Sequence, residues 1–233
     1  MAKVSAWYDN EWGFSNGINN EGKMDGVNSG RNKPHGPYMK YLEENGLREK
    51  HIQDFDLRRS KTGATFSTPL PDVSYCDNWI GQNGLNLINS VPVDESWFLQ
   101  VNFTGPHAPM DITKSMAELY QHEVFPLPDD DQFPAETHQA IRRNYAAMIE
   151  NIDRWIGLYL EVLEKRGDLS NTLIVFSSDH GEMLGDHGRW GKGDPYHPSV
   201  SVPLVISGPN FDHKLLSRNR LTHSIFLHGR RSY

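Results

Sequence analysis

The clearest periodic pattern in the chain runs from Glu136 to Arg166, where apolar side chains recur every three or four residues. The apolar stripe consists of Ile141, Tyr145, Met148, Ile149, Ile152, Trp155, Ile156, Tyr159 and Leu163. This spacing follows the 3.6-residue turn and predicts one amphipathic helix whose apolar face packs in the core. Gly167 comes directly afterwards, and glycine is the residue type that most often ends a helix.

Three other stretches have the pattern of strands rather than helices. They are 97–103 (WFLQVNF), 172–178 (TLIVFSS) and 202–207 (VPLVIS), short apolar runs rich in aromatic or β-branched residues, which predict buried strands. The order strand, long helix, strand favours a parallel sheet with right-handed crossovers. We therefore expect an α/β fold in which helices flank a mostly parallel sheet.

The remaining patterns are weaker. Residues 37–45 and 75–88 can form helices, although Gly81 and Gly84 count against the second one. Residues 17–33 are rich in Gly and Asn and predict a loop. Residues 47–72 are polar, without a clear period, and predict irregular structure.

Composition limits the kinds of binding partner and the cellular location that we expect for the chain. The chain has 233 residues and a formal net charge of -7, which argues against nucleic acid or an anionic membrane as its main partner. It contains no apolar run of about 18 residues, the length that a transmembrane helix needs. Asp9 and Glu11 stand where a signal peptide needs an apolar core, so we expect a cytoplasmic location for the chain as written. Cys76 is its one cysteine and predicts ordinary packing, and the oligomeric state is left open.

Chemically active residue types gather between the last two predicted strands. Asp179 and His180 directly follow the strand 172–178, and at the carboxyl end of a strand both can reach one divalent cation. His187 and Lys192 follow within the same loop, and His107 lies in TGPHAP after the strand 97–103. The set suits a substrate with an anionic tetrahedral group, because metal and Lys would neutralise charge while an imidazole protonates a leaving oxygen.

The order SDHGEMLGDHGxWGKGxPY, then VPLxISGP, after a strand that ends in a PHxP-type loop, resembles the sulfatases of the alkaline phosphatase superfamily. The resemblance implies that Asp179 and His180 bind the metal, usually calcium in sulfatases, with manganese or zinc in related hydrolases. It implies that Lys192 contacts the sulfate and that His107 contacts it or assists the leaving group. His187 is a further catalytic candidate. The implied partner is a small-molecule sulfate or phosphate ester.

Two parts of the family pattern are absent from the sequence. The nucleophile motif C/S-x-P-x-R, whose first residue becomes formylglycine, does not occur, since Cys76 is followed by Asp-Asn-Trp-Ile. The pair of metal-binding aspartates expected at the end of the first strand is also missing. We therefore expect the chain to be the later part of a sulfatase domain, truncated at its N-terminus and impaired in activity.

The chain divides into three expected parts. Residues 2–16 (AKVSAWYDNEWGFSN) resemble a short segment near the C-terminus of glyceraldehyde-3-phosphate dehydrogenase, and we interpret residues 1–16 as foreign to the rest, through a fusion or a gene-model artefact. Residues 17–209 form the incomplete sulfatase-like domain. Residues 210–233 form a basic, irregular tail.

Three hypotheses remain open at this point. The first is a sulfuric ester hydrolase or a fragment of one. The second is a phosphonate or phosphodiester hydrolase of the same superfamily, which His180 and His187 favour because imidazole suits transition metals. The third is a non-catalytic chain that binds an anion, which the missing nucleophile favours.

Overall fold

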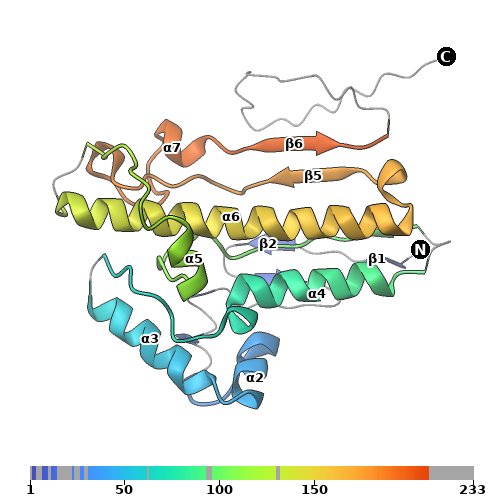
Figure 1. Cartoon of the computed structure of the whole chain (residues 1–233), viewed down its shortest axis with the longest axis horizontal. Helices are drawn as coiled ribbons and strands as arrows, with labels where there is room; N and C mark the ends of the chain where they lie inside the picture. Colours follow the sequence, from blue (N-terminus) through green and yellow to red (C-terminus); the bar gives the residue numbers. More distant parts are fainter. Residues whose placement is uncertain are drawn as a thin grey trace. The chain divides into compact units, whose positions relative to one another are not determined.

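A computed structural model of the chain describes residues 2–3, 7–9, 12–14, 23, 27–28, 31–61, 63–92, 96–129 and 132–209 (Figure 1). The chain divides into two compact units, one of residues 1–127 with 133–162 and one of residues 128–132 with 163–233. The expected tail 210–233 lies outside the described residues, and so does most of the segment 1–33. The division into a foreign segment, a domain and a tail stays a prediction.

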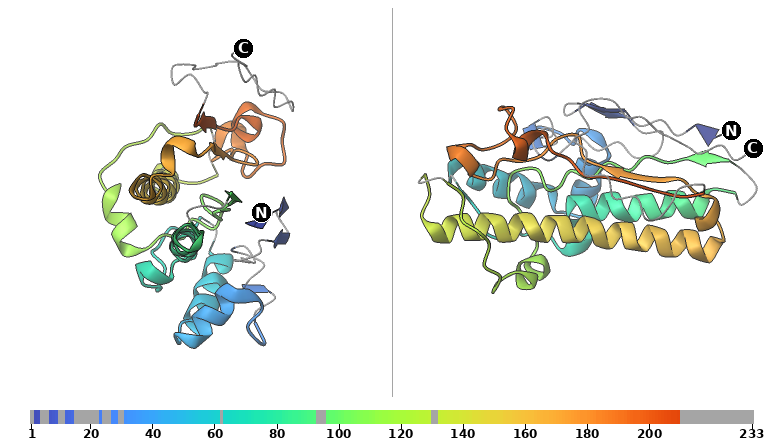
Figure 2. Two further views of the ribbon diagram at one scale, coloured as in Figure 1. Left: turned by 90° about the vertical axis from the view of Figure 1, so that its right-hand side faces the viewer. Right: turned by 90° about the horizontal axis from the view of Figure 1, so that it is seen from above.

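The first unit is built mainly from helices. They are α2 (Gly36–Glu44), α3 (Arg48–Ser60), α4 (Cys76–Ser90), α5 (Lys114–Leu119) and most of α6 (Ala135–Arg166), with the 3-10 turn η1 (Asp72–Ser74) before α4. Within this unit α4 and α6 lie side by side and are seen end-on in the left view of Figure 2. The predicted helices 37–45, 75–88 and 136–166 are thereby confirmed as α2, α4 and α6. No helix in the described part of the chain has the length and apolar character that crossing a membrane requires.

The prediction of irregular structure for 47–72 was wrong, because residues 48–60 form α3. The inward face of α3 carries polar residues as well as Ile52 and Phe55, and it includes the buried pair Asp54 and Arg58. In this pair Arg58 Nε donates to Asp54 Oδ2 over 2.8 Å. A helix whose buried side is partly charged has no apolar stripe for a sequence reading to find.

The glycines that counted against α4 are what allows it to pack closely on α6. A Cβ at Gly81 would lie 2.1 Å from Cδ2 of Trp155, and one at Gly84 would lie 2.3 Å from the hydroxyl oxygen of Tyr159. The Tyr159 hydroxyl also donates to the Gly81 carbonyl over 3.0 Å. Glycine therefore lets two large aromatic side chains lie directly on the helix backbone.

The core of this unit is a cluster around α2, α3 and the start of α4. Its buried members are Val27, Tyr38, Met39, Leu42, Ile52, Phe55, Leu70, Cys76 and Ile80. Cys76 is a buried thiol within this cluster, as packing predicts.

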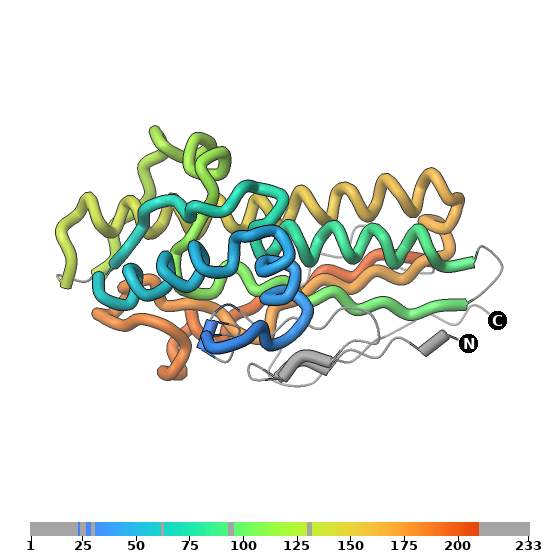
Figure 3. The backbone as a smooth tube through the Cα atoms, turned by 90° about the horizontal axis from the view of Figure 1, so that it is seen from below, coloured from blue at the N-terminus to red at the C-terminus, as the bar shows by residue number. Residues whose placement is uncertain are grey.

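The strands among the described residues form three two-stranded pairs. β1 (Ala2–Lys3) pairs with β4 (Trp97–Phe98) in parallel, and β2 (Trp7–Asp9) pairs with β3 (Trp12–Phe14) antiparallel. In the second unit β5 (Ile174–Ser177) and β6 (Leu204–Ser207) run side by side (Figure 3). They are antiparallel, with Val175 opposite Ile206.

The described pairs correct two expectations about the strands. A mostly parallel sheet is not what they form, since β5 and β6 are joined by a loop with only short helical turns, whereas parallel strands need a longer crossover. Both strands were expected to be buried, yet Val175, Phe176 and Val205 are exposed. The apolar runs predicted both strands correctly. They did not predict burial, because burial depends on whether another layer of the fold covers the strands. The expected strand 97–103 is confined to Trp97–Phe98.

Candidate active site

The loop between β5 and β6 is folded back on itself around one buried side chain. Met183 is fully buried, and its amide donates to the Gly191 carbonyl over 3.0 Å. Glu182 Oε1 accepts from the Gly191 amide at 2.6 Å and from the Leu184 amide at 3.3 Å. These bonds hold the two arms of the loop together and fix the backbone next to Lys192.

A short helix supports the same loop from its far end. In α7 (His197–Val200), the Ser199 hydroxyl donates to the Lys192 carbonyl over 2.9 Å, and the Ser199 carbonyl accepts from the Gly181 amide at 2.7 Å. A Cβ at Gly181 would lie 1.9 Å from the Pro198 carbonyl oxygen, so this approach requires glycine. The backbone on both sides of His180 and Lys192 is thus anchored by hydrogen bonds.

Three of the predicted site residues come together at the carboxyl end of β5. The His180 Nδ1 lies 2.7 Å from the Gly181 carbonyl oxygen, and because a carbonyl can only accept, this nitrogen carries the proton. The His180 Nε2 lies 2.6 Å from the Lys192 ammonium and 3.4 Å from Asp179 Oδ2. The ring is therefore oriented so that Nε2 points into the charged cluster of Asp179 and Lys192.

His187 has a different environment. It lies in the 3-10 turn η3 (Asp186–Gly188) with a φ of 57°, and its ring stacks on Tyr196 with the ring centres 4.8 Å apart. A stacked, exposed ring accounts for its position through packing alone. Its catalytic role stays a prediction.

His107 belongs to the helical unit, on the loop that follows Phe103. Its ring Nδ1 lies 2.6 Å from the Ala108 carbonyl oxygen, so this nitrogen also carries the proton and Nε2 is left with the lone pair. Its own carbonyl accepts from the buried Lys23 ammonium at 3.2 Å. The structure thus fixes the tautomer of His107, while its meeting with the residues of the other unit remains a proposal.

A protein-family profile described as Sulfatase matches residues 5–229 of the chain. The chain belongs to the sulfatase family. It is 32% identical over 152 residues to an arylsulfatase of Clostridium perfringens and 32% identical over 178 residues to a choline-sulfatase of Rhizobium meliloti. These matches cover 57% and 64% of this chain but 32% and 35% of those proteins, so the sulfatase-family chain spans about a third of their length.

Solved structures agree with this family at the level of the fold. A phosphonate monoester hydrolase of Agrobacterium radiobacter has a TM-score of 0.62 and 22% identity, over 72% of this chain and 40% of that one. A phosphonate monoester hydrolase of Silicibacter pomeroyi has a TM-score of 0.54 and 24% identity, over 59% and 33%. The expected α/β fold of the alkaline phosphatase type is confirmed, and identities this low support the fold alone.

The donor set of this sulfatase-family chain fits part of a metal site. Two ligands bound to one Zn²⁺ at about 2.1 Å in tetrahedral geometry lie roughly 3.4 Å apart, and Asp179 Oδ2 and His180 Nε2 have this separation. Among the residues that the structure describes, no cluster of three or more His, Cys, Asp or Glu could hold a metal ion. The Lys192 ammonium lies 2.6 Å from His180 Nε2, so a cation bound to this nitrogen would displace it.

Cys76 does not replace the missing nucleophile of the family. The thiol is fully buried at the start of α4, and burial, followed by the charge of Asp77, raises its pKa well above the usual range. A neutral, inaccessible thiol is a poor nucleophile.

The sulfatase family's motifs did not point to every residue that shapes these loops. Glu182, Ser199, Asp77 and Lys23 were not predicted, because each acts through bonds to backbone of another part of the chain, within the same loop for the first two and 27 and 84 positions away for Asp77 and Lys23. Glu182 stands inside the DHGE run and could have been suspected from its place there. The other three have no local sequence signal.

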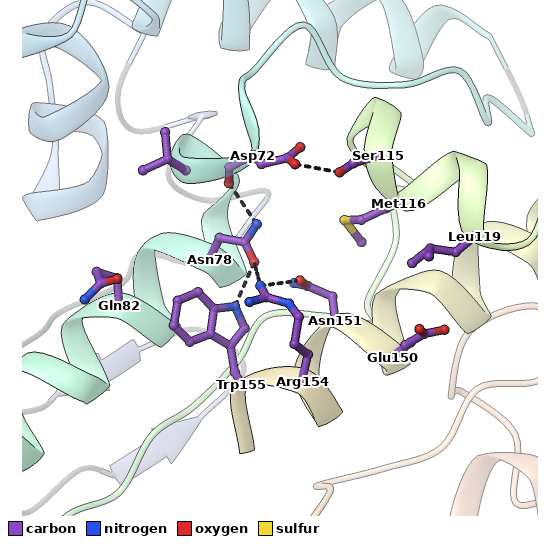
Figure 4. Close-up of a pocket in the computed structure, with 11 residues that line it drawn as sticks. Asp72, Asn78, Gln82, Ser115, Met116, Leu119, Glu150, Asn151, Arg154 and Trp155 are labelled. Carbon is purple, nitrogen blue, oxygen red and sulfur yellow. Dashed lines mark hydrogen bonds between the residues drawn. The ribbon is translucent and has the colours of Figure 1, made fainter. Parts of the chain in front are cut away.

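A concavity of about 450 Å³ lies in the helical unit between η1, α4, α5 and α6 (Figure 4). At its floor Asn78 Oδ1 accepts from the Trp155 indole at 2.7 Å and from Arg154 at 3.1 Å. None of the predicted site residues lines it. Its polar groups are mostly engaged with one another, which is typical of a structural junction between helices.

Proposed function

We propose that this chain carries the sulfate-contacting groups and half of the metal ligands of a metal-dependent sulfate ester hydrolase. The observation that carries the proposal is His180 held between the Asp179 carboxylate and the Lys192 ammonium, at 3.4 Å and 2.6 Å, at the end of β5. The arylsulfatase and choline-sulfatase relatives, named for sulfate esters, support this substrate class over others.

Lys192 has the role of neutralising the negative charge on a sulfate oxygen. Gly191 and Gly193 flank it, and a Cβ at either position would meet nothing within 4 Å, so the backbone beside the lysine is open. A compact ammonium beside an open backbone suits a tetrahedral anion. The anchored loop keeps this charge in one place, which lowers the cost of binding.

His107 is proposed to act on the leaving oxygen, following the motif TGPHAP that it shares with the family. The Nδ1–H of His107 donates a hydrogen bond to the Ala108 carbonyl. Nε2 is therefore the ring atom that can exchange a proton with the substrate. A protonated imidazole placed beside the leaving oxygen can act as a general acid and protonate an alkoxide or phenoxide.

Asp179 and His180 would hold the divalent cation, for which calcium is the family expectation and manganese or zinc the alternative. A bound cation supplies charge stabilisation to the sulfate oxygens. The chain's own part is to orient His180 through its bond to the Gly181 carbonyl. A bound sulfate would attract the Lys192 ammonium away from His180 Nε2.

The missing C/S-x-P-x-R motif defines what this chain is expected to do by itself. Without a formylglycine residue there is no covalent sulfate intermediate, so we expect anion binding without efficient turnover. The test is calorimetric titration with sodium sulfate in the presence of calcium, together with an assay on an aryl sulfate and on a phosphonate monoester.

The matched variants are Lys192→Met and, as control, Lys114→Met on the exposed side of α5. We expect sulfate affinity to fall by at least about tenfold in the first, the loss of one charge-assisted bond, and to be unchanged in the second. Failure of the unaltered chain to bind sulfate would count against the proposal. Faster turnover of the phosphonate ester would instead favour the second hydrolase class, to which the imidazole ligand His180 is suited.

A further inference from the structure

Asp77 is a fully buried carboxylate whose hydrogen bonds go to a single short loop. It is the second residue of α4, with an exposed fraction of 0%. Its Oδ1 accepts from the Thr104 amide at 2.7 Å and the Thr104 hydroxyl at 2.8 Å, and its Oδ2 accepts from the Gly105 amide at 3.0 Å. Burying a charge is costly unless its hydration is replaced, and here the replacement comes from the backbone just before His107.

The lack of a side chain at Gly105 leaves room for the Asp77 carboxylate. A Cβ at position 105 would lie 2.5 Å from Asp77 Oδ2, well inside a van der Waals contact. Only glycine lets the carboxylate approach the loop closely enough to accept from the Gly105 amide.

A second buried charge holds the later part of the same loop. The Lys23 ammonium donates to the His107 carbonyl over 3.2 Å and to Asp111 Oδ1 over 2.8 Å. The hydroxyl of Tyr75, the N-cap residue of α4, donates to the Asp111 carbonyl over 3.0 Å. The loop from 104 to 111 is therefore tied at both ends by buried side chains.

We propose that Asp77 is a positioning residue for anion binding, because it fixes the Thr104–Gly105 backbone and thereby the direction of the His107 ring. The inference rests on the proposed role of His107. Asp77 does not itself touch the anion. Its removal frees the loop, so the ring samples several directions and contacts the anion in only some of them.

The test uses the full chain with ¹³C-labelled histidine and follows the His107 ring resonance by NMR during titration with sodium sulfate. Asp77→Asn keeps Oδ1, which accepts from the Gly105 amide at 3.2 Å, and loses the shorter 3.0 Å bond from that amide to Oδ2. We expect the apparent affinity at His107 to fall by up to about tenfold in this variant, the factor for one bond to a charged group. Thr104→Val removes only the hydroxyl bond, and we expect about a threefold loss. Asp153→Asn, an exposed carboxylate on α6, is the control and is expected to bind as the unaltered chain does.

The two proposals fail in different ways. If the unaltered chain shows no change of the His107 resonance with sulfate while His180 responds, the role of His107 fails. If His107 responds equally in Asp77→Asn and the unaltered chain, with the fold intact, Asp77 has only a structural role and the inference is overturned. Should Asp77→Asn not fold, Thr104→Val decides: unchanged affinity overturns the inference, and weakened affinity with unchanged stability supports it.

Discussion

His51 on α3 is a buried imidazole whose surroundings oppose its protonation. Its ring packs against Phe55 and Tyr38, with centroids 4.7 Å and 5.8 Å away. Burial is the main cause that lowers its pKa, to about 4, and the charges of Arg58 and Lys23 lower it further. His51 is therefore neutral in the folded chain at every pH where an unfolded histidine, with its value of 6.5, begins to charge.

The lowered pKa of His51 makes the stability of the fold depend on pH. Below pH 6.5 His51 binds a proton in the unfolded state but stays neutral in the folded state. The free energy of unfolding therefore falls as the pH drops from 6.5 to about 4, by on the order of 3 kcal/mol. We expect His51→Phe, which keeps an aromatic ring and cannot titrate, to flatten this part of the curve. Urea unfolding at a series of pH values measures it, and parallel curves for the two chains would contradict the assignment.

The close contact of Gly81 with Trp155 predicts how a side chain at position 81 changes stability. Because a Cβ there would overlap the Trp155 ring, Gly81→Ala forces α4 and α6 apart and should cost about 1–3 kcal/mol. Gly157→Ala on α6 is the matched control: a Cβ there meets nothing within 4 Å, so the change should stabilise the chain by up to about 1 kcal/mol. Urea midpoints compare the two, and equal effects would show that the contact with Trp155 is not tight.

At the scale of the element, α3 carries two aspartates in contrasting positions. Asp54 is 6% exposed and paired with buried Arg58, whose guanidinium also donates to the Phe66 carbonyl over 2.7 Å. Asp56 pairs with Arg31 at the surface. Asp54→Ala leaves a buried guanidinium without its carboxylate and should cost about 3–5 kcal/mol.

The change Asp56→Ala on the same helix serves as the comparison. Its ion pair is solvent-exposed, so the unfolding midpoint should hardly move. Thermal unfolding followed by circular dichroism measures both variants. A similar shift for both would mean that burial of the Asp54 pair does not decide its contribution.

Sequence reasoning succeeded for elements whose pattern is local. The stripe of α6 and the apolar runs of β5 and β6 gave their positions, and the cluster of Asp179, His180 and Lys192 was recognisable because these residues share one loop. It failed for α3, whose buried face is polar. It also could not find Asp77, which acts on Thr104 across 27 positions of sequence, because nothing in the chain marks which backbone a carboxylate will meet.

At the scale of the whole molecule, the pair β5–β6 presents apolar side chains to solvent. Val175 and Val205 are 57% and 56% exposed, and among the described strands neither β5 nor β6 pairs with a third. Open edges with apolar faces are sites for pairing between chains. We therefore expect the purified chain to associate as its concentration rises.

The change Val205→Lys should reduce this association by placing a charge on the strand. Val124→Lys is the control, since Val124 is 80% exposed but lies in a loop of the other unit. Light scattering over a range of concentrations measures the effect. Equal reduction by both variants would point to net charge rather than to the strand pair.

The contact between Gly81 and Trp155 also constrains which sequences can descend from this one. A relative that gains a side chain at position 81 must lose volume at position 155 at nearly the same time, since either change alone leaves an overlap or a void. The same linkage ties Gly84 to Tyr159. Positions 81 and 155 should therefore vary together among homologues, and so should positions 84 and 159. A comparison of family sequences could detect the packing of α4 on α6 from these paired substitutions alone.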